Sequence, residues 1–328
     1  MGKFKALLVT KSGDTQSADW TELDDSELME GDVTVRVTHS TLNYKDGLAI
    51  TGTAPIIDSY PMIPGIDLAG VVEESSAADV KPGDQVLVNG CGIGERHFGG
   101  YAERARVKSE WVVPVPDGWS CAEAMAVGTA GYTAMLCVLG LLDHGLTPDR
   151  GPVVVTGASG GVGSVAIALL AKHGFHVVAS TGRTEEEDYL KSIGAAEIID
   201  RKELQGELRP LDEIRWAGGV DAIGSITLAN VLSQTQFYGV VTCCGIAGGR
   251  DLPASVLPFI LRGVTLQGCE SIYTPRPLRL RAWQQLGKDM DRDILKAMSR
   301  TYPVTKVLEM APEILAGKIR GRTIYEIG

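Results

Sequence analysis

The sequence has few basic residues, no paired cysteines and, we expect, no apolar run long enough to cross a membrane. Its 31 lysines and arginines are outnumbered by 41 aspartates and glutamates, and a net charge of −10 argues against a protein that binds nucleic acid. We expect no segment to approach the roughly 18 uncharged apolar residues that span a bilayer, and the first apolar run is too short for a secretory signal. The six cysteines form no C-x-x-C pair, which favours free thiols and a cytoplasmic protein.

What is abundant is glycine, which supplies 40 of the 328 residues. Glycine serves tight turns and places where backbone approaches a ligand closely. The length predicts about two domains, and a composition of 44% hydrophobic and 22% charged residues is typical of a folded globular protein.

The first 120 residues consist of short runs of alternating polarity between turns rich in glycine, proline and aspartate. The predicted strands are Phe4–Thr10, Asp32–Thr38, Leu68–Glu73, Gln85–Asn89 and Tyr101–Val107. This part is therefore expected to be a mostly β domain, in the form of a small barrel.

Beyond residue 121 the pattern changes to an alternation of strands and helices. A long apolar run with helix formers covers Glu123–Leu141. It is followed by predicted strands at Val153–Thr156, His176–Ser180, Glu197–Ile199, Val220–Ala222, Gly239–Cys243 and Thr265–Leu266, with helices at Val162–His173 and Glu185–Ile193. Such alternation predicts a doubly wound parallel sheet, so the fold class is α/β.

The end of the chain leaves this pattern. A helix is predicted over Leu278–Met290, and a last strand over Arg322–Glu326 is expected to return to the β domain. We therefore predict a β-rich catalytic domain over 1–122, a Rossmann domain over 123–272, and a return to the catalytic domain over 273–328.

The strongest local motif lies between the predicted strand Val153–Thr156 and the helix that follows. It reads Gly157-Ala158-Ser159-Gly160-Gly161-Val162-Gly163. Small residues permit the tight turn, backbone amides approach a pyrophosphate, and the last glycine lets the helix pack closely on the strand. The unpaired N–H groups of the helix start would receive the anion. The strand, loop and helix together predict a dinucleotide site rather than an ordinary turn.

The end of the next strand selects the cofactor. An NAD site usually carries an acidic residue about 20 residues after the glycines, whereas this strand ends in Ser180-Thr181-Gly182-Arg183. Hydroxyls and an arginine suit the 2′-phosphate of NADPH, which a carboxylate would repel. Arg201, after the third strand, is a second candidate cation, although it could equally be a solvated surface residue.

A β-rich domain followed by this cofactor domain resembles the medium-chain dehydrogenase/reductase superfamily, whose β domain is GroES-like. Where many members carry zinc-binding cysteine and histidine, this chain has Asn43-Tyr44-Lys45-Asp46 and Pro64-Gly65-Ile66-Asp67. Zinc needs three or four converging ligands, and the five histidines show no such grouping. We therefore expect a metal-free enzyme, which favours reduction of an activated C=C bond over alcohol oxidation.

Longer strings narrow the resemblance to the zinc-free acryloyl-CoA reductase branch of the quinone-oxidoreductase-like proteins. They are STLNYKDGLAITG (40–52), YPMIPGIDLAGVV (60–72), GTAGYTAMLCVLGL (128–141), VVVTGASGGVG (153–163), PFILRGVTLQG (258–268) and GRT (321–323). The resemblance implies a homodimer that reduces acryloyl-CoA to propanoyl-CoA with NADPH. It places the cofactor against Tyr44, Ser159, Gly160, Gly161, Val162, Thr181, Gly182, Arg183, Arg201, Leu266 and Arg322.

Tyr44 and Asp46 are the predicted catalytic residues. Tyr44 can donate a hydrogen bond or proton, or merely bind the cofactor, and a structural role is a better interpretation of Asp46 than acid catalysis. Coenzyme A needs local positive charge; Arg262, Arg276, Arg279 and Arg281 are candidates, although a solvated surface is the better interpretation of their spacing. The alternative functions are an NADPH:quinone oxidoreductase and a non-catalytic NADPH-binding protein.

Overall fold

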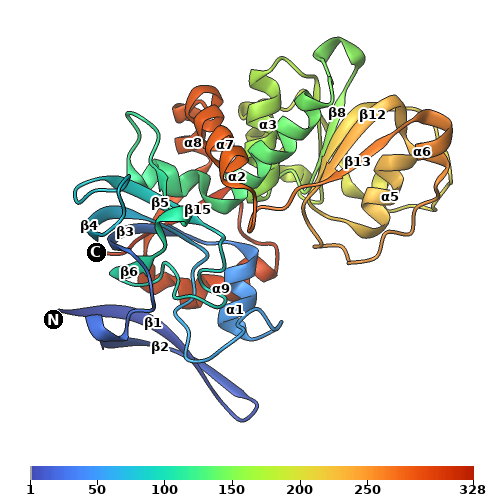
Figure 1. The fold of residues 1–328 in the computed structure, drawn as a ribbon. Helices are drawn as coiled ribbons and strands as arrows, with labels where there is room; N and C mark the ends of the chain where they lie inside the picture. Colours follow the sequence, from blue (N-terminus) through green and yellow to red (C-terminus); the bar gives the residue numbers. More distant parts are fainter. Residues whose placement is uncertain (1) are drawn as a thin grey trace. The chain divides into compact units, whose positions relative to one another are not determined.

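The computed structural model describes residues 2–328, which form two compact units. The first unit contains the chain up to Thr129, together with Ser271–Gly287 and Leu295–Gly328; the second contains Ala130–Glu270 and Lys288–Ile294. Figure 1 shows the strands and helices of each unit along the chain. The domain boundaries predicted at residues 122 and 272 stay predictions.

The first unit is built on β strands. A hairpin pairs β1 (Lys3–Ser12) with β2 (Thr15–Asp24), and a larger sheet has the order β14-β15-β3-β4-β5-β7, with β6 also paired to β3. The strands of that sheet are β3 (Val33–Thr41), β4 (Asp67–Ser75), β5 (Gln85–Asn89), β6 (Arg104–Val107), β7 (Val113–Pro114), β14 (Ser299–Pro303) and β15 (Arg322–Glu326). Over residues 2–328 these pairings run as an open path, so the predicted small barrel is not closed by strand pairing.

The predicted return of the last strand is confirmed. Strand β15 pairs antiparallel with β3, with Ile324 opposite Thr41. Helices α1 (Tyr44–Thr51) and α9 (Val307–Leu315) lie side by side in this unit (Figure 1). Gly47 permits that approach, because a Cβ added there would lie 2.9 Å from the carbonyl oxygen of Ala311.

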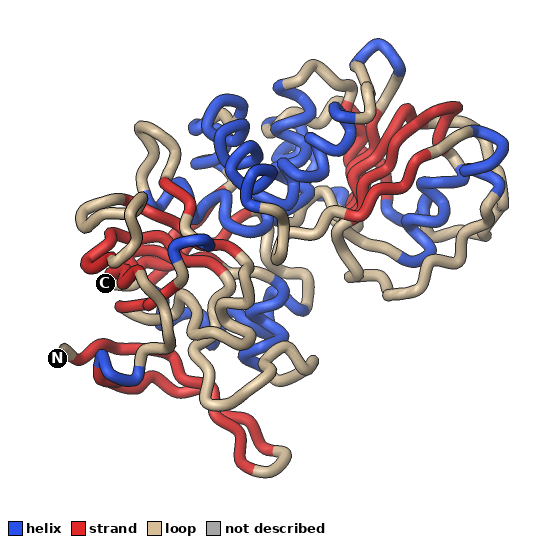
Figure 2. The backbone as a smooth tube through the Cα atoms, in the orientation of Figure 1, coloured by secondary structure: helices blue, strands red, loops and turns tan. Residues whose placement is uncertain are grey.

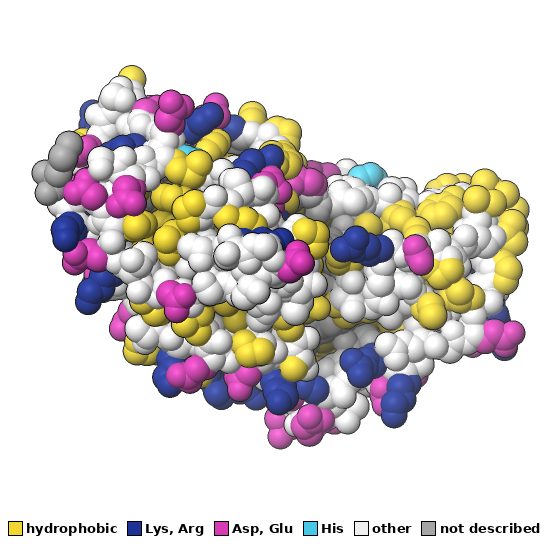
Figure 3. Space-filling model, turned by 90° about the horizontal axis from the view of Figure 1, so that it is seen from below, with side chains coloured by type: hydrophobic (Ala, Val, Ile, Leu, Met, Phe, Trp, Pro, Cys, Tyr) yellow, Lys and Arg dark blue, Asp and Glu magenta, His cyan; other side chains and the backbone are white. Residues whose placement is uncertain are grey.

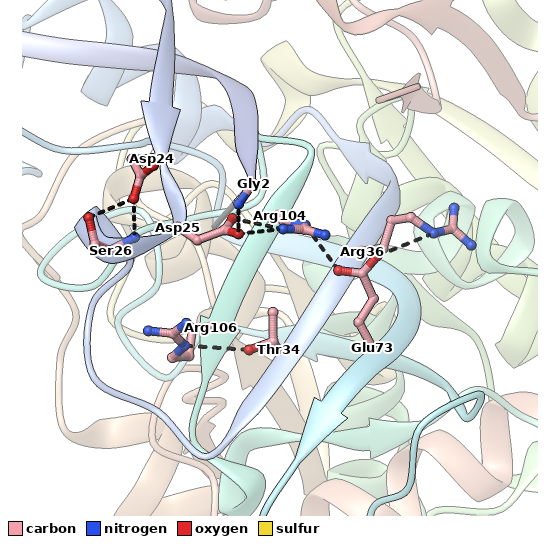
Figure 4. A network of polar contacts seen from close by, with 9 residues as sticks. All are labelled: Gly2, Asp24, Asp25, Ser26, Thr34, Arg36, Glu73, Arg104 and Arg106. Carbon is pink, nitrogen blue, oxygen red and sulfur yellow. Dashed lines mark hydrogen bonds and ion pairs between the residues drawn. The ribbon is translucent and has the colours of Figure 1, made fainter.

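A polar network fastens the hairpin to the larger sheet (Figure 4). The Asp25 carboxylate, in the short helix η1 (Asp25–Glu27) after β2, accepts from the Gly2 backbone at 2.6 Å and from Arg104 Nη1 at 2.7 Å. Arg104 Nε lies 3.0 Å from Glu73 of β4. The network therefore ties the start of β1 to β6 and β4.

The second unit contains a six-stranded sheet in the order β10-β9-β8-β11-β12-β13, and every pairing in it is parallel. Its strands are β8 (Val153–Thr156), β9 (Val177–Thr181), β10 (Glu197–Asp200), β11 (Trp216–Asp221), β12 (Thr235–Cys243) and β13 (Thr265–Gly268). Its helices include α3 (Gly161–Lys172), α4 (Glu187–Ser192), α5 (Ser225–Ser233) and α6 (Leu257–Arg262), and they cover both faces of the sheet (Figure 2). The predicted doubly wound α/β domain is confirmed.

Other helices and 3-10 turns complete the chain. They are α7 (Arg276–Asp289), α8 (Arg292–Ala297), η2 (Ser109–Trp111), η3 (Pro148–Arg150), η4 (Thr184–Glu186), η5 (Arg201–Leu204) and η6 (Val304–Lys306). The helix predicted over Glu185–Ile193 is thus divided between η4 and α4.

Helix α2 (Cys121–Asp143) corrects one expectation. Among residues 2–328 it is a helix long and apolar enough to cross a membrane by length and composition, so the expectation that no such run exists is wrong. Burial explains its apolarity, because 89% of its most apolar window is buried inside the fold. Its backbone breaks at Gly128, where φ is 51° and ψ is −163°.

Candidate cofactor and active site

The glycine loop after β8 has the geometry that the motif predicts. The chain turns at Gly157, with a φ of 62°, and α3 begins directly after Gly160. A Cβ added at Gly163 would collide with the Gly157 carbonyl and lie 2.7 Å from Ala158 Cα. Only glycine therefore lets the start of α3 pack this closely on the loop.

The start of α3 offers backbone donors to a ligand. The Ser164 N–H bonds to the Gly160 carbonyl at 2.9 Å, whereas the N–H groups of the first turn have no partner further back in a helix. Gly161 and Val162 in that turn are partly exposed. The Ser159 hydroxyl lies 3.0 Å from the Thr181 hydroxyl and so joins the loop to the end of β9. These groups fit the pyrophosphate of a dinucleotide.

The structure brings Arg201 to the end of β9. Parallel pairing places Asp200 of β10 opposite Thr181, so the chain after β10 lies beside the chain after β9. A Cβ added at Gly182 would lie only 2.5 Å from Arg201 Nε, which shows that the Arg201 side chain covers this glycine. Thr181, Gly182 and Arg201 therefore form one cluster.

Arg183 is positioned differently from Arg201. Its Nη1 lies 3.3 Å from Glu186, three residues on in the same turn. The nearby Asp200 carboxylate accepts from the Lys202 backbone at 2.9 Å and caps η5. The hydroxyl and guanidinium groups at the end of β9 fit the 2′-phosphate of NADPH.

Two further residues of this unit concern the site. Leu266 of β13 is partly buried opposite Val241 of β12, and its predicted cofactor contact stays a prediction. Asp221, which the sequence analysis did not select, is fully buried at the end of β11 and accepts from Thr156 Oγ1 and the Gly224 backbone, both at 2.7 Å. Burial raises its pKa. Asp221 thus holds the turn after β11 against the end of β8.

In the first unit, Tyr44 and Asp46 have opposite environments. Tyr44 opens α1 and is 46% exposed, whereas Asp46 is fully buried. The Asp46 carboxylate accepts from the backbone N–H of Asn43 at 2.8 Å and of Ile66 at 2.9 Å. Burial first, and then the charge of Asp67, raise its pKa to about 7. Asp46 therefore positions α1, and Tyr44 carries the accessible polar group.

Asp67 is a second buried carboxylate that the sequence analysis missed. It accepts from the side-chain amides of Asn43 and Asn89, each at 2.7 Å, and from Thr129 through its backbone at 2.9 Å and its hydroxyl at 2.6 Å. Thr129 restarts α2 after the break at Gly128. Asp67 thus caps the second half of this helix.

Arg322 lies beside these carboxylates. It is 2% exposed and donates from Nε to the Ala126 carbonyl at 2.8 Å and from Nη2 to Thr41 Oγ1 at 2.9 Å. A Cβ added at Gly128 would lie 2.7 Å from Arg322 Nη2 and 3.0 Å from Asp67 Oδ2, so the two charges flank this glycine. Burial lowers the pKa of Arg322, whereas the negative charges of Asp67 and Asp46 raise it in part. Its predicted cofactor contact stays a prediction.

No group of three or more His, Cys, Asp or Glu side chains in residues 2–328 could hold a metal ion. Ile66, at the position where the family resemblance led us to look for a zinc-binding histidine, is buried, and its backbone donates to Asp46. The metal-free character of the site stays an expectation.

Comparison with known proteins gives a consistent result. Residues 29–117 match the family "alcohol dehydrogenase GroES-like domain", and residues 161–284 match "zinc-binding dehydrogenase". The chain is 49% identical to the acrylyl-CoA reductase of Ruegeria pomeroyi and 40% identical to a putative quinone oxidoreductase of Bacillus subtilis, covering 99% of each chain. It is similar to a Salmonella enterica oxidoreductase solved with NADP, at a TM-score of 0.97 and 48% identity, over 99% of this chain and 100% of that one.

Proposed function

This chain belongs to the medium-chain dehydrogenase/reductase family, in its acryloyl-CoA reductase branch, and from that premise we propose that it reduces the C=C bond of acryloyl-CoA to propanoyl-CoA with NADPH. The observation that carries the proposal is the phosphate loop together with Arg201, whose side chain covers Gly182 at the end of β9. The end of that strand carries no carboxylate. NADPH, when bound, supplies the hydride that adds to the β-carbon of the thioester.

The residues of the second unit bind and orient the cofactor. The first-turn amides of α3 and the Ser159 hydroxyl hold the pyrophosphate. Thr181 and Arg201 hold the 2′-phosphate, because a guanidinium makes charge-assisted hydrogen bonds to phosphate. Orientation of this kind is a large part of catalysis when the cofactor carries the reactive atom.

In the first unit we assign Tyr44 as the proton donor. Its exposed phenol can reach a ligand, and hydride addition leaves negative charge on the thioester oxygen and a proton to be added at the α-carbon. Asp46 is a positioning residue, since its carboxylate is occupied by the Asn43 and Ile66 backbone. A Tyr44→Phe enzyme is expected to lose turnover at saturating substrate by about 10²-fold. Full turnover would instead indicate protonation by water.

The direct test is NADPH oxidation with acryloyl-CoA, crotonoyl-CoA, a quinone, or no acceptor, with the product identified by mass spectrometry. We expect turnover with acryloyl-CoA and propanoyl-CoA as product. Because a relative is a putative quinone oxidoreductase, quinone reduction is the second candidate. Activity with the quinone alone would establish it in place of the first, and no activity with any acceptor would indicate a non-catalytic NADPH-binding protein.

We further propose a homodimer formed through the edge of the second unit's sheet. Strand β13 is the last strand of that sheet. Large apolar side chains are exposed nearby, with Tyr238 74%, Ile260 68% and Val256 64% exposed, and apolar side chains gather on this part of the second unit (Figure 3). Sedimentation of the wild type is expected to give a dimer, and Ile260→Asp a monomer. A monomeric wild type would refute this.

We also place the protein in the cytoplasm. All six cysteines are free thiols, as a reducing compartment would keep them. Fractionation of cells that express the chain at native level is expected to recover it with cytoplasmic marker enzymes, and recovery with another compartment would overturn the assignment.

A further inference from the structure

A cavity of about 910 Å³ opens within the first unit, apart from the residues assigned to NADPH. Its size lies within the range of roughly 300–1,000 Å³ that small-molecule sites occupy. Three chain segments form most of its wall: the loop after β5, the stretch around η2, and the segment that leads into α7. The side chains that matter below are Arg96, Lys108, Trp111, Tyr273, Arg276 and Arg279.

The cavity is locally basic in an acidic protein. Four cationic side chains line it, against the two carboxylates of Glu30 and Glu110. Arg276 and Arg279 are part of its construction, because Arg276 Nη1 donates to the Glu110 carbonyl at 2.8 Å and Arg279 Nη1 to the Asn89 carbonyl at 2.8 Å. Arg276 also lies 3.8 Å from Asp79, which offsets part of its charge. The wall still carries more cationic than anionic groups, which favours anions.

The other two cations lie over aromatic rings. The Arg96 guanidinium is 5.0 Å from the centre of the Tyr273 ring, and Lys108 Nζ is 5.5 Å from that of Trp111. Both side chains are exposed, and Tyr273 is 60% exposed. Trp111 is held by an edge contact with His97, whose ring centre is 5.0 Å away. A cation beside an exposed aromatic ring is a pair of groups that binds a nucleotide, because the cation contacts its phosphates and the base stacks on the ring or on the guanidinium plane.

The wall of the cavity is bonded to the segment that carries Tyr44. Lys45, the next residue of α1, forms an ion pair of 3.1 Å with Glu95, which precedes Arg96. The Gly90 backbone donates to the Ile66 carbonyl at 3.1 Å, and the Ile66 backbone donates to Asp46 at 2.9 Å. The cavity and the assigned proton donor are therefore parts of one connected structure within this unit.

We propose that this cavity binds the phosphorylated adenosine end of coenzyme A, with Arg96 and Lys108 on the phosphates and the adenine on Tyr273. The assignment rests on the proposed function, which supplies an acyl-CoA as substrate. The proposed site explains how a protein with a net charge of −10 can bind an anionic thioester, because the positive charge is concentrated in the wall of this cavity. Arg276 and Arg279, interpreted from sequence as solvated surface, are wall residues of this site.

The first test is calorimetric titration of coenzyme A into enzyme saturated with NADP⁺, which fills the cofactor site and prevents turnover. The variants are Arg96→Gln, Lys108→Gln and Tyr273→Ala, with Lys81→Gln, an exposed lysine outside the cavity wall, as the matched control. We expect each cavity variant to weaken binding about tenfold or more and the control to bind as wild type does. Undiminished binding by the three cavity variants, or no binding by wild type, overturns the proposal.

The second test separates this site from the proposed reaction and from a site for free nucleotides. KM is measured for acryloyl-CoA and for acryloyl-pantetheine, which lacks the nucleotide. We expect Arg96→Gln and Lys108→Gln to raise KM about tenfold for acryloyl-CoA, with kcat and the KM for acryloyl-pantetheine unchanged. Equal effects on both thioesters, or weakened binding of ADP but not of coenzyme A, overturn the proposal while the reaction stands. If the enzyme does not reduce acryloyl-CoA, the calorimetric titration still shows whether the cavity binds coenzyme A.

Discussion

Replacing Arg201 by glutamine tests the cofactor assignment most directly. The side chain lies over Gly182 at the end of β9, where the 2′-phosphate of NADPH is proposed to bind. A hydrogen bond to a charged group contributes about 1.5–3 kcal/mol, so Arg201→Gln is expected to weaken NADPH binding about 10- to 100-fold. NADH, which lacks that phosphate, is expected to bind almost unchanged.

A second substitution perturbs the same guanidinium without removing it. In Gly182→Ala the new Cβ would lie 2.5 Å from Arg201 Nε and 2.7 Å from Cζ, whereas carbon contacts normally reach about 3.5–4.0 Å. The Arg201 guanidinium must therefore move by about 1 Å. It can do so because it is the flexible end of an exposed side chain. We expect a loss of NADPH affinity of about tenfold and a change in unfolding free energy within about 0.5 kcal/mol.

The assay is the change in NADPH and NADH fluorescence on titration with enzyme. Lys202→Gln is the matched control, because Lys202 is the next residue, carries the same charge and is 84% exposed. It is expected to bind both cofactors as wild type does. Equal losses of NADPH and NADH affinity in Arg201→Gln, or equal effects of Arg201→Gln and Lys202→Gln, would refute the assignment.

Three further substitutions test the fold around the two sites. Gly163→Ala drives a Cβ against the Gly157 carbonyl and should cost about 1–3 kcal/mol in urea unfolding, whereas Gly206→Ala, with open space around it, should cost nothing comparable. Asp67→Ala leaves buried donors without an acceptor and should cost at least about 3 kcal/mol, seen as a lower Tm; an unchanged Tm contradicts its capping role. The raised pKa of Asp46, about 7, means that the folded state holds its proton more tightly, so this contribution is full below the unfolded pKa of about 3.9 and is lost as pH rises to about 7. Urea unfolding against pH should show this decline in wild type and not in Asp46→Asn, and equal slopes would contradict it.

The strands that sequence predicted well are those with local signals. Gln85–Asn89, Val153–Thr156 and Arg322–Glu326 are observed at the predicted bounds, since each combines β-forming residues with flanking turns. Strand β2 was missed because only Leu23 among its residues is buried. Its polar sequence becomes a strand through pairing with β1.

Helix α2 shows a different error, because the expectation that no apolar run has the length of a membrane span overlooked it. Its composition resembles that of a membrane span, yet most of its apolar window is buried in the fold. Length and hydropathy cannot distinguish a buried core helix from a membrane helix, because both remove the same side chains from water. The packing of the rest of the chain decides between them.

The phosphate loop could be predicted from sequence because every constraint on it is local. Gly157 must turn and Gly163 must let α3 approach, and both lie within one strand–loop–helix unit. Which charged groups come into contact depends instead on the three-dimensional fold. Asp67 takes donors from residues 22 to 62 positions away, and Arg201 reaches Gly182 through the pairing of two parallel strands. The cavity in the first unit likewise joins segments far apart in the chain. Ion pairs and hydrogen bonds form between groups a few ångströms apart in space. The number of residues between two groups predicts their distance only when both lie in the same helix, strand or turn.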